Sequence, residues 1–527
     1  MNWSNFKYLG SAALSLWVLI SMSCNLPWLN IESQATPTVA PTLDLAYSNS
    51  PTPLGPSAFP TPDKTTSPFP FTGLSTATPG PAHAAETSPT GEAALPILYY
   101  TQSGDTLQTV AWRFGVEIDQ IQSQQNLPVE GYLPPGQSLN IPDVLGATPF
   151  PSALLPDSEV VNSPSALDFH IQPFISQAGG FLSTYDEKVG EEQLSAAQII
   201  ERISIETSIN PRLLLAFLEF RSHWLYSQPE TLGDLDYPIG FYVPGHKGLY
   251  EELLFTAKQI GLGYYGWRMG TTATLNFPDG QVARLSPGLN AGSLAVQYLF
   301  SKFYSQPAWL DALYGPDNFP QLYQRMFGDP WARAAAVEPL FPPGLAQPIL
   351  ELPISPGERW SFSGGPHKAW DTGTPPGAID FSPVTAQPPC SVSSAWVTAS
   401  TSGLVARSAR NAVALDLDGD GHEQTGWVLV YFHIADAERV APGAWVELDA
   451  PLGHPSCEGG DSTGTNVHLA RKYNGEWLPA AGPLPFVLSG WEVRGGARSY
   501  EGLLVKGDQV VSANPSGART SIIVRDK

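Results

Sequence analysis

Histidine and aspartate residues recur in the last third of the chain, each in a segment that reads as a strand or a glycine-rich turn. The segments are SFSGGPHKAW with His367, PPGAIDFSP with Asp380, GWVLVYFHI ending at His433, and NVHLARKY with His468. Two histidines and one aspartate can give a zinc ion three protein ligands and leave the fourth position for water, as a catalytic site requires. Ordinary surface or buried histidines are the alternative, and the spacing alone leaves both interpretations open.

The stretch TGTNVHLARKYNGEW places Asn466 two residues before His468. Side chains two apart in a strand share a face, so we expect Asn466 and His468 to point the same way, with Val467 turned into a core. A His-x-His pair would put a metal ligand beside a catalytic base. This chain has Asn-x-His instead, which raises the question of whether such a site is fully active.

An antiparallel sheet must position these residues. From about Glu351 onward the chain is rich in glycine, β-branched and aromatic residues separated by turns, which is typical of antiparallel strands. Alternation from Trp427 through Phe432 extends to His433, so we expect His433 to lie on a defined face of its strand.

The order of these segments is similar to that in lysostaphin-type (LytM-like) zinc metalloendopeptidases, which cut peptide crosslinks of peptidoglycan. GAIDF, YFHI and TGTNVHLARKYNGEW correspond in order to that family's Asp motif, its strand-end His and its final His-x-His. The resemblance covers roughly Ser355 to Trp491 and implies a peptidase-like domain over residues 350–527 that uses Zn2+.

The resemblance also implies a role for each residue. His367, Asp380 and His468 would bind the metal, and the catalytic pair would be Asn466 and His433, which positions or polarises water. The family has His at the position of Asn466. Asparagine can donate a hydrogen bond through its amide but cannot titrate near neutral pH, so we expect a weak enzyme.

The chain departs from the family at the first ligand. The family commonly has His four residues before the Asp, where this chain has Pro376, and His367 lies thirteen residues before Asp380. A looped insertion must therefore bring the two together. The alternative partner of His367 is Asp371, which has the family spacing but lies in the turn-rich run DTGTPPG, whereas Asp380 lies in the strand-like AIDF.

The first residues read as a targeting segment. Lys7 precedes the apolar run LGSAALSLWVLISMSC, which is too short for a comfortable membrane span. Small residues before Cys24 resemble a bacterial lipoprotein cleavage site, so we predict a signal peptide over residues 1–24 with lipid on Cys24. An ordinary cleaved signal and an uncleaved anchor are the alternatives. The other two cysteines, Cys390 and Cys457, are expected to form a disulfide in an exported protein.

A spacer and a small module follow. Residues 25–96 are dominated by Pro, Thr, Ser and Ala and are predicted to be an extended, disordered linker. Residues 97–143 closely resemble a LysM module, a βααβ unit that binds N-acetylglucosamine-containing glycans such as peptidoglycan. We expect helices beginning at Leu107 and over residues 118–125. The resemblance implies a glycan groove lined by Gly104, Asp105, Thr106, Leu107, Leu133 and Pro134.

Residues 165–345 are predicted to be mainly helical, with Asn210 and Pro211 starting one helix. The region moderately resembles the lysozyme-like domain of lytic transglycosylases, whose catalytic Glu usually precedes a Ser. Here Arg221 precedes Ser222, and Glu219 lies two positions earlier, about 200° around a helix. We therefore predict a noncatalytic domain.

An acidic segment, DLDGDGHEQTGW, starts like a calcium-binding loop. An EF-hand requires Glu at its twelfth position, which here is Trp427. A hairpin turn between two strands is the favoured interpretation.

Together these features predict a multidomain α+β protein, exported and anchored to the membrane facing the cell wall. The 527 residues give room for several domains, and the net charge of -22 argues against nucleic acid as a partner. The predicted function is zinc-dependent hydrolysis of peptidoglycan crosslinks. The alternative is a noncatalytic wall-binding or scaffold lipoprotein with a degenerate peptidase domain.

Overall fold

A computed structural model describes residues 95–527 except 147, 149–151, 385–386, 461 and 527. The described residues all belong to one compact unit. The predicted signal peptide, Cys24 and almost all of the predicted linker lie outside the described residues.

The LysM-like module has its own small core. Its elements are β1 (Ile97–Tyr100), α1 (Leu107–Phe114), the 3-10 turn η1 (Ile118–Gln120) and β2 (Ser138–Ile141). β1 pairs with β2 in an antiparallel sheet. Thr106 caps α1 by accepting from the Thr109 N–H, and Gly115 ends the helix in a left-handed conformation with φ 69°. Val110, Leu139 and Ile141 are fully buried in this core.

The second helix predicted over residues 118–125 is wrong. Only the 3-10 turn forms, and the backbones of Gln122 and Asn140 then exchange two hydrogen bonds of 3.0 and 2.8 Å. This pairing requires an extended backbone at Gln122. The stretch offers only Ile118 and Ile121 as apolar residues, too few to hold a helix against the module.

The middle region is mainly helical, as predicted. Asn210 caps the helix that starts at Pro211, by accepting from the Arg212 N–H at 3.0 Å. The helices are α2 (Ile171–Ala178), α3 (Ala196–Thr207), α4 (Pro211–Ser222), α5 (Leu232–Asp236), α6 (Leu249–Arg268), α7 (Ala291–Phe300), α8 (Gln306–Tyr314), α9 (Phe319–Phe327) and α10 (Pro330–Val337). The strands form the hairpins β3 (Asp186–Val189) with β4 (Glu192–Ser195), and β5 (Thr274–Asn276) with β6 (Val282–Arg284). The 3-10 turns are η2 (Asp157–Glu159), η3 (Pro164–Ala166) and η4 (Phe181–Thr184).

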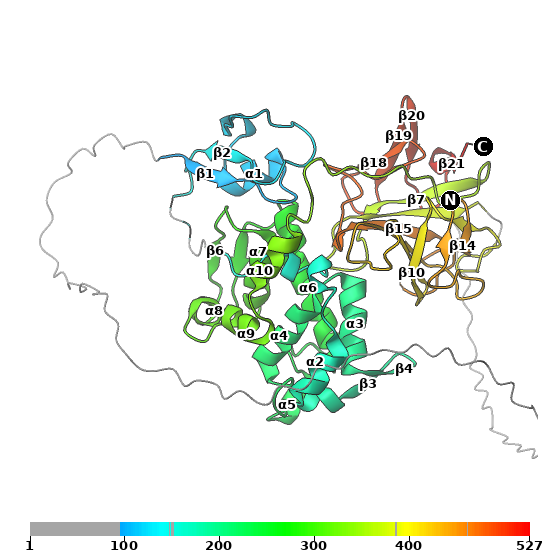
Figure 1. The fold of residues 1–527 in the computed structure, drawn as a ribbon. Coiled ribbons are helices and arrows are strands. Elements are labelled where there is room, and N and C mark those ends of the chain that lie inside the picture. The colour runs from blue at the N-terminus through cyan, green and yellow to red at the C-terminus, as the bar shows by residue number, and fades with distance from the viewer. Residues whose placement is uncertain (1–94, 147, 149–151, 385–386, 461, 527) are drawn as a thin grey trace, which may run out of the picture. The chain divides into compact units, whose positions relative to one another are not determined.

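The C-terminal region is built on a nine-stranded antiparallel sheet, which confirms the predicted sheet (Figure 1). Its strand order is β13-β10-β11-β12-β15-β8-β7-β21, with β16 paired to β15. The bounds are β7 (Arg359–His367), β8 (Ala378–Pro383), β10 (Gly403–Ala409), β11 (Ala412–Asp416), β12 (Trp427–Phe432), β13 (Trp445–Val446), β15 (Val467–Tyr473), β16 (Glu476–Trp477) and β21 (Ile522–Val524). Smaller sheets pair β9 (Val397–Thr398) with β14 (Pro451–Gly453), and join β17 (Val487–Leu488), β18 (Trp491–Gly495), β19 (Gly502–Lys506) and β20 (Gln509–Ser512). The 3-10 turn η5 (Arg519–Ser521) precedes β21.

Both faces of the central strands are buried. Leu429 and Tyr431 of β12 pack into a core made within the C-terminal region, whereas Val428 and Val430 join the core that also contains the helices. Burial on both faces explains the unbroken apolar run of β12. The alternation predicted to reach His433 stops at Phe432, because His433 follows the strand with φ 63°.

Two loop predictions are confirmed. Cys390 and Cys457 form a disulfide with their Cα atoms 4.9 Å apart. The acidic segment is the hairpin turn between β11 and β12, where Asp416 accepts from the Gly421 N–H at 2.8 Å and Trp427 begins β12.

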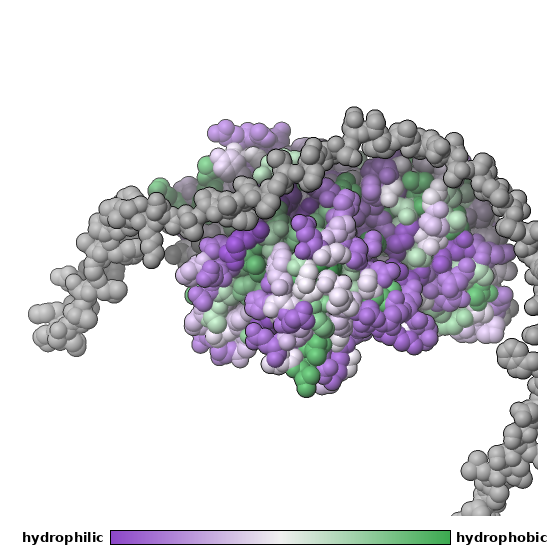
Figure 2. Space-filling view, turned by 60° about the horizontal axis from the view of Figure 1, so that its bottom comes forward, coloured by the Kyte–Doolittle hydropathy of each residue, from purple (hydrophilic) through white to green (hydrophobic). Residues whose placement is uncertain are grey.

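On the face drawn in Figure 2, hydrophilic residues separate the hydrophobic ones into small patches. Among the residues that the structure describes, no helix is both long enough and apolar enough to cross a membrane.

Candidate metal centre

Three neighbouring strands carry the predicted ligands. His367 is the last residue of β7, Asp380 lies in β8, and His468 lies in β15. Strand β8 lies between the other two, and His468 pairs directly with Asp380 across the β15–β8 ladder. Directly paired residues have neighbouring side chains, so the register itself brings these two together.

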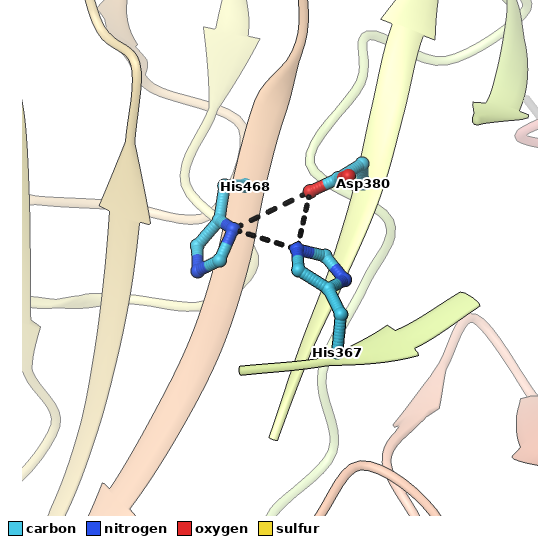
Figure 3. A group of neighbouring side chains, drawn as sticks. All are labelled: His367, Asp380 and His468. Carbon is cyan, nitrogen blue, oxygen red and sulfur yellow. Dashed lines mark hydrogen bonds and ion pairs between the residues drawn. The ribbon is translucent and has the colours of Figure 1, made fainter. Parts of the chain in front are cut away.

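The ligand atoms of the three residues converge on one point (Figure 3). His367 Nε2 lies 3.0 Å from His468 Nδ1 and 3.3 Å from Asp380 Oδ1, and His468 Nδ1 lies 3.4 Å from Asp380 Oδ1. The side chains are 4%, 8% and 13% exposed for His367, His468 and Asp380. Solvent therefore does little to screen these atoms from one another.

Backbone carbonyls fix the tautomers of both histidines. His367 Nδ1 lies 2.9 Å from Gly365 O, and His468 Nε2 lies 2.9 Å from Ala369 O. A carbonyl oxygen only accepts, so these nitrogens carry the hydrogens, and the lone pairs of the other two nitrogens face each other. Asp380 Oδ1 is buried without a hydrogen-bond partner. Two nitrogen lone pairs and a carboxylate oxygen thus meet at one buried point, which is an arrangement suited to binding a cation.

The charges of the site agree with this geometry. Burial alone would raise the pKa of Asp380, but His367 and His468 outweigh it and hold that pKa well below its usual range. Burial alone would lower the pKa of His367, but the charge of Asp380 outweighs it and raises that pKa. The carboxylate is therefore ionised at neutral pH and stabilises positive charge beside the imidazoles.

Zinc fits the spacing of the three atoms. With metal–ligand bonds of about 2.0–2.1 Å, the edges of a zinc tetrahedron are about 3.4 Å, and the observed separations are 3.0–3.4 Å. Among the described residues, Asp416, Asp418 and Asp420 also gather closely enough to hold an ion. Asp416 accepts backbone N–H groups of Asp418 and Gly421 there, as expected for a hairpin turn.

Asp371, the alternative partner of His367, points elsewhere. Its carboxylate pairs with Lys258 of α6 at 2.8 Å. The insertion expected between His367 and Asp380 is the loop that carries Asp371, and Ala369 in that loop supplies the carbonyl that orients His468. The insertion is thus part of the candidate site.

His433 lies beside the three ligands. Its ring is perpendicular to that of His468, with centroids 6.1 Å apart. Its Nδ1 lies 2.9 Å from Glu458 O, so Nε2 carries the lone pair. Burial lowers the pKa of His433, which keeps the ring neutral and able to accept a proton at neutral pH.

Asn466 is held by its own loop. It precedes β15, and its side-chain nitrogen donates to Ser462 Oγ at 2.9 Å and to Gly464 O at 2.8 Å. Asn466 Oδ1 is buried without a partner. The donor role expected from the sequence would require one of these two bonds to break, and the free atom of the side chain is an acceptor.

Three contributors to the site were not found from the sequence. Tyr500 stacks on His367, with ring centroids 4.2 Å apart, and Glu458 orients His433. Gly364 faces Asp380, and a Cβ atom there would lie 2.4 Å from Asp380 Oδ2. The Gly-Gly pair just before His367 was a possible signal for Gly364, whereas Tyr500 lies far along the chain, next to no motif.

The structure brings the two predicted LysM loops together. The Leu133 N–H donates to Asp105 O at 2.7 Å. Gly104 and Leu133 also lie at a cavity of about 210 Å3, most of whose lining comes from residues outside the module, such as Phe341 and Leu484. The side chains of Asp105 and Thr106 serve the module itself. Asp105 accepts from the Tyr99 hydroxyl at 2.6 Å and pairs with a buried arginine, and Thr106 caps α1.

Glu219 of the middle region caps a loop. Its carboxylate accepts from the Leu225 N–H at 3.0 Å and from the Tyr226 N–H at 3.3 Å. These bonds give the buried carboxylate a structural role, and the absence of catalysis in this region stays a prediction.

The chain is similar to known proteins in three ways. Residues 99–142 match the LysM domain family, which confirms the predicted module, and residues 153–340 match the family of the LasA N-terminal domain. Protease LasA from two Pseudomonas aeruginosa strains is 26% identical over 307 residues, covering 54% of this chain and 68% of the relative. The predicted resemblance to a LytM-like metalloendopeptidase joined to a LysM module is thereby confirmed. The lysozyme-like character of the middle region stays a prediction, and this region matches the LasA N-terminal domain.

Solved structures overlap with part of the chain. The M23 metalloprotease pseudoalterin from the deep sea is 22% identical, with 32% of this chain and 96% of that chain covered and a TM-score of 0.26. The catalytic domain of lysostaphin from Staphylococcus simulans is 19% identical, with 23% and 89% covered and a TM-score of 0.17. Because these TM-scores are low, the overlaps add nothing to the sequence matches.

We predict that Asp380→Ala abolishes tight zinc binding and that Asp371→Ala retains it. Asp380 supplies a converging oxygen, whereas Asp371 is bound to Lys258. Zinc per chain after dialysis, measured by mass spectrometry, checks this, with His367→Ala and His468→Ala expected to behave like Asp380→Ala. Loss of zinc in Asp371→Ala and its retention in Asp380→Ala would reverse the assignment.

We predict that Gly364→Ala weakens zinc binding by about 10- to 100-fold, the usual effect of disturbing a group that orients a ligand. The added methyl group would displace the Asp380 carboxylate. Gly464→Ala is the matched control, because a Cβ atom there meets nothing within 4 Å. Competition with a zinc chelator measures both affinities, and equal affinities in the two variants would contradict the prediction.

Proposed function

We propose that this protein is a zinc metalloendopeptidase that hydrolyses peptide crosslinks of peptidoglycan and is targeted to them by its LysM module. The observation that carries the proposal is the convergence of two fixed imidazole lone pairs and an ionised carboxylate at one buried point. Its similarity to protease LasA and its LysM match support a proteolytic function at the cell wall.

The proposed chemistry divides between the metal and the chain. A zinc ion held by His367, Asp380 and His468 would supply a Lewis acid for the scissile carbonyl and for the attacking water. His367 and His468 would hold the metal through lone pairs that stay free because Gly365 O and Ala369 O accept the N–H groups of the two rings. His433 is neutral and presents Nε2 as a base, which can take a proton from the attacking water and return it to the leaving amine.

The presence of Asn466 supports a second candidate function, that of a noncatalytic wall-binding protein with a degenerate peptidase domain. Its amide cannot move a proton near neutral pH, and both of its N–H bonds are used by the loop. We favour the weak enzyme, because His433 retains the geometry of a base.

We also propose that the chain is exported and held at the membrane by lipid on Cys24, with the linker placing the LysM module at the wall. This proposal is supported by the sequence alone, through the apolar run near the N-terminus that ends in Ser-Met-Ser-Cys.

Replacing His433 tests the catalytic proposal. We predict that His433→Ala lowers kcat on crosslinked wall peptides by about 100- to 10,000-fold, the usual contribution of one acid–base group, while zinc content is unchanged. His422→Ala is the control, because His422 is exposed in the acidic hairpin and should leave the rate unchanged. Release of amines from purified wall measures the rates.

Asn466→His separates the two candidate functions. A rate above wild type is expected, because imidazole at this position can titrate near neutral pH. A zinc-loaded wild type that is inert on every wall substrate, together with an inert Asn466→His, would establish the binding module instead.

Mass spectrometry of the membrane-extracted N-terminus tests the anchor. We predict diacylglyceryl on Cys24, because its two acyl chains anchor a protein stably whereas one chain alone binds membranes only marginally. An unmodified Cys24, or cleavage at another residue, would reject the lipid anchor and leave the peptidase proposal untouched.

A further inference from the structure

Three consecutive residues, Ser456, Cys457 and Glu458, hold His433 from both ends. The Ser456 N–H and the Ser456 hydroxyl both donate to the His433 carbonyl oxygen, at 2.8 and 2.9 Å. Glu458 O accepts from His433 Nδ1 at 2.9 Å. The backbone and the ring of His433 are therefore fixed by one tripeptide.

His433 needs this support because it lies outside β12 and adopts a left-handed conformation with φ 63°. Such a conformation is unfavourable for a residue other than glycine unless its surroundings enforce it. The ring also has two tautomers, and only a partner that accepts at Nδ1 keeps the lone pair on Nε2.

The middle residue of the tripeptide is covalently anchored. Cys457 is bonded to Cys390, 67 residues earlier in the chain. Thr465, which follows in the same loop, donates through its hydroxyl to Ser391 O at 2.7 Å, beside the same cysteine. The disulfide thus ties the tripeptide to a segment outside the loop.

The Glu458 carboxylate fastens the other end of the tripeptide. It accepts from Asn411 Nδ2 at 2.8 Å and from the Asp436 N–H at 3.0 Å. Asn411 O in turn accepts from the N–H of Ile434, the residue after His433. Glu458 therefore joins the tripeptide to the segment on the far side of His433.

We propose that the Cys390–Cys457 disulfide and Glu458 are positioning elements for His433, so that reduction of the disulfide disables the base while the metal stays bound. The inference rests on the proposed function insofar as it treats His433 as the base. The tripeptide makes no hydrogen bond with His367, Asp380 or His468, and their ligand atoms are fixed by Gly365 O, Ala369 O and the strand register. Cys390 is exposed, so a reductant can reach the disulfide.

The test reduces the zinc-loaded full chain with a water-soluble phosphine, since thiols compete for zinc. The phosphine attacks one sulfur and breaks the S–S bond. Water then supplies the oxygen of the phosphine oxide, and its two protons give two thiols. The 15N NMR spectrum of histidine-labelled protein is recorded before and after, with the His433 signals assigned by their loss in His433→Ala.

Before reduction, the His433 signals should be those of a single tautomer with hydrogen on Nδ1, and after reduction they should be those of a mixture of both tautomers. Zinc content should stay unchanged. The kcat should fall at least 10-fold at nearly constant KM. An unchanged His433 spectrum in the fully reduced protein would overturn the inference, as would loss of zinc in step with the spectral change. If the spectrum responds while the oxidised chain hydrolyses no wall substrate, the positioning stands and the proposed function fails.

Variants give a second measurement that does not depend on the reductant. Glu458→Gln keeps an oxygen that accepts from Asn411 and Asp436 and should retain the wild-type spectrum, whereas Glu458→Ala should show the mixed tautomers. Glu438→Ala is the matched control, because Glu438 lies in the same region and bonds to His454 rather than His433. Equal spectra for Glu458→Ala and Glu438→Ala would argue against Glu458 as a positioning residue.

Discussion

The candidate site is a local arrangement that is unfavourable in isolation. Two imidazole lone pairs and a carboxylate oxygen meet at one buried point, where like partial charges repel and little water is present to screen them. Only a proton or a metal ion placed between them removes the repulsion. The surrounding contacts hold this arrangement in place. The Gly365 and Ala369 carbonyls prevent the rings from turning their N–H groups inward, and the space at Gly364 admits the Asp380 carboxylate.

Strand periodicity explains which parts of the site were readable from the sequence. Asp380 lies in a buried strand, where successive side chains alternate between the two faces, so its position in the strand determines the face to which its side chain points. Pairing of β8 with β15 then sets Asp380 opposite His468. The same reasoning preferred Asp380 to Asp371, which lies in a turn-rich loop and is bound to Lys258. The disulfide and the sheet were predictable for similar reasons, because cysteine number and residue composition constrain them without knowledge of tertiary contacts.

The failures lie where tertiary contacts override local pattern. The second LysM helix was predicted from two isoleucines, but backbone pairing of Gln122 with Asn140 drew the chain into an extended form. The alternation of β12 was carried one residue too far, because the tripeptide beside His433 enforces a conformation that no local pattern signals. Asn466 and Tyr500 belong to loops, where hydrogen-bond partners and stacking depend on how distant segments meet.

The site is therefore built by two kinds of support that differ in rigidity. The proposed metal ligands lie on adjoining strands of a sheet buried on both faces, so moving them would disturb the core. His433 and Asn466 depend on the loop before β15, which is held by side-chain hydrogen bonds and one disulfide. Local opening is easiest where few apolar contacts are lost, so the loop can respond to conditions that leave the sheet intact. Binding of the metal and proton transfer beside it can consequently vary independently in this chain. A replacement such as Asn466 can alter proton transfer without disturbing the metal ligands.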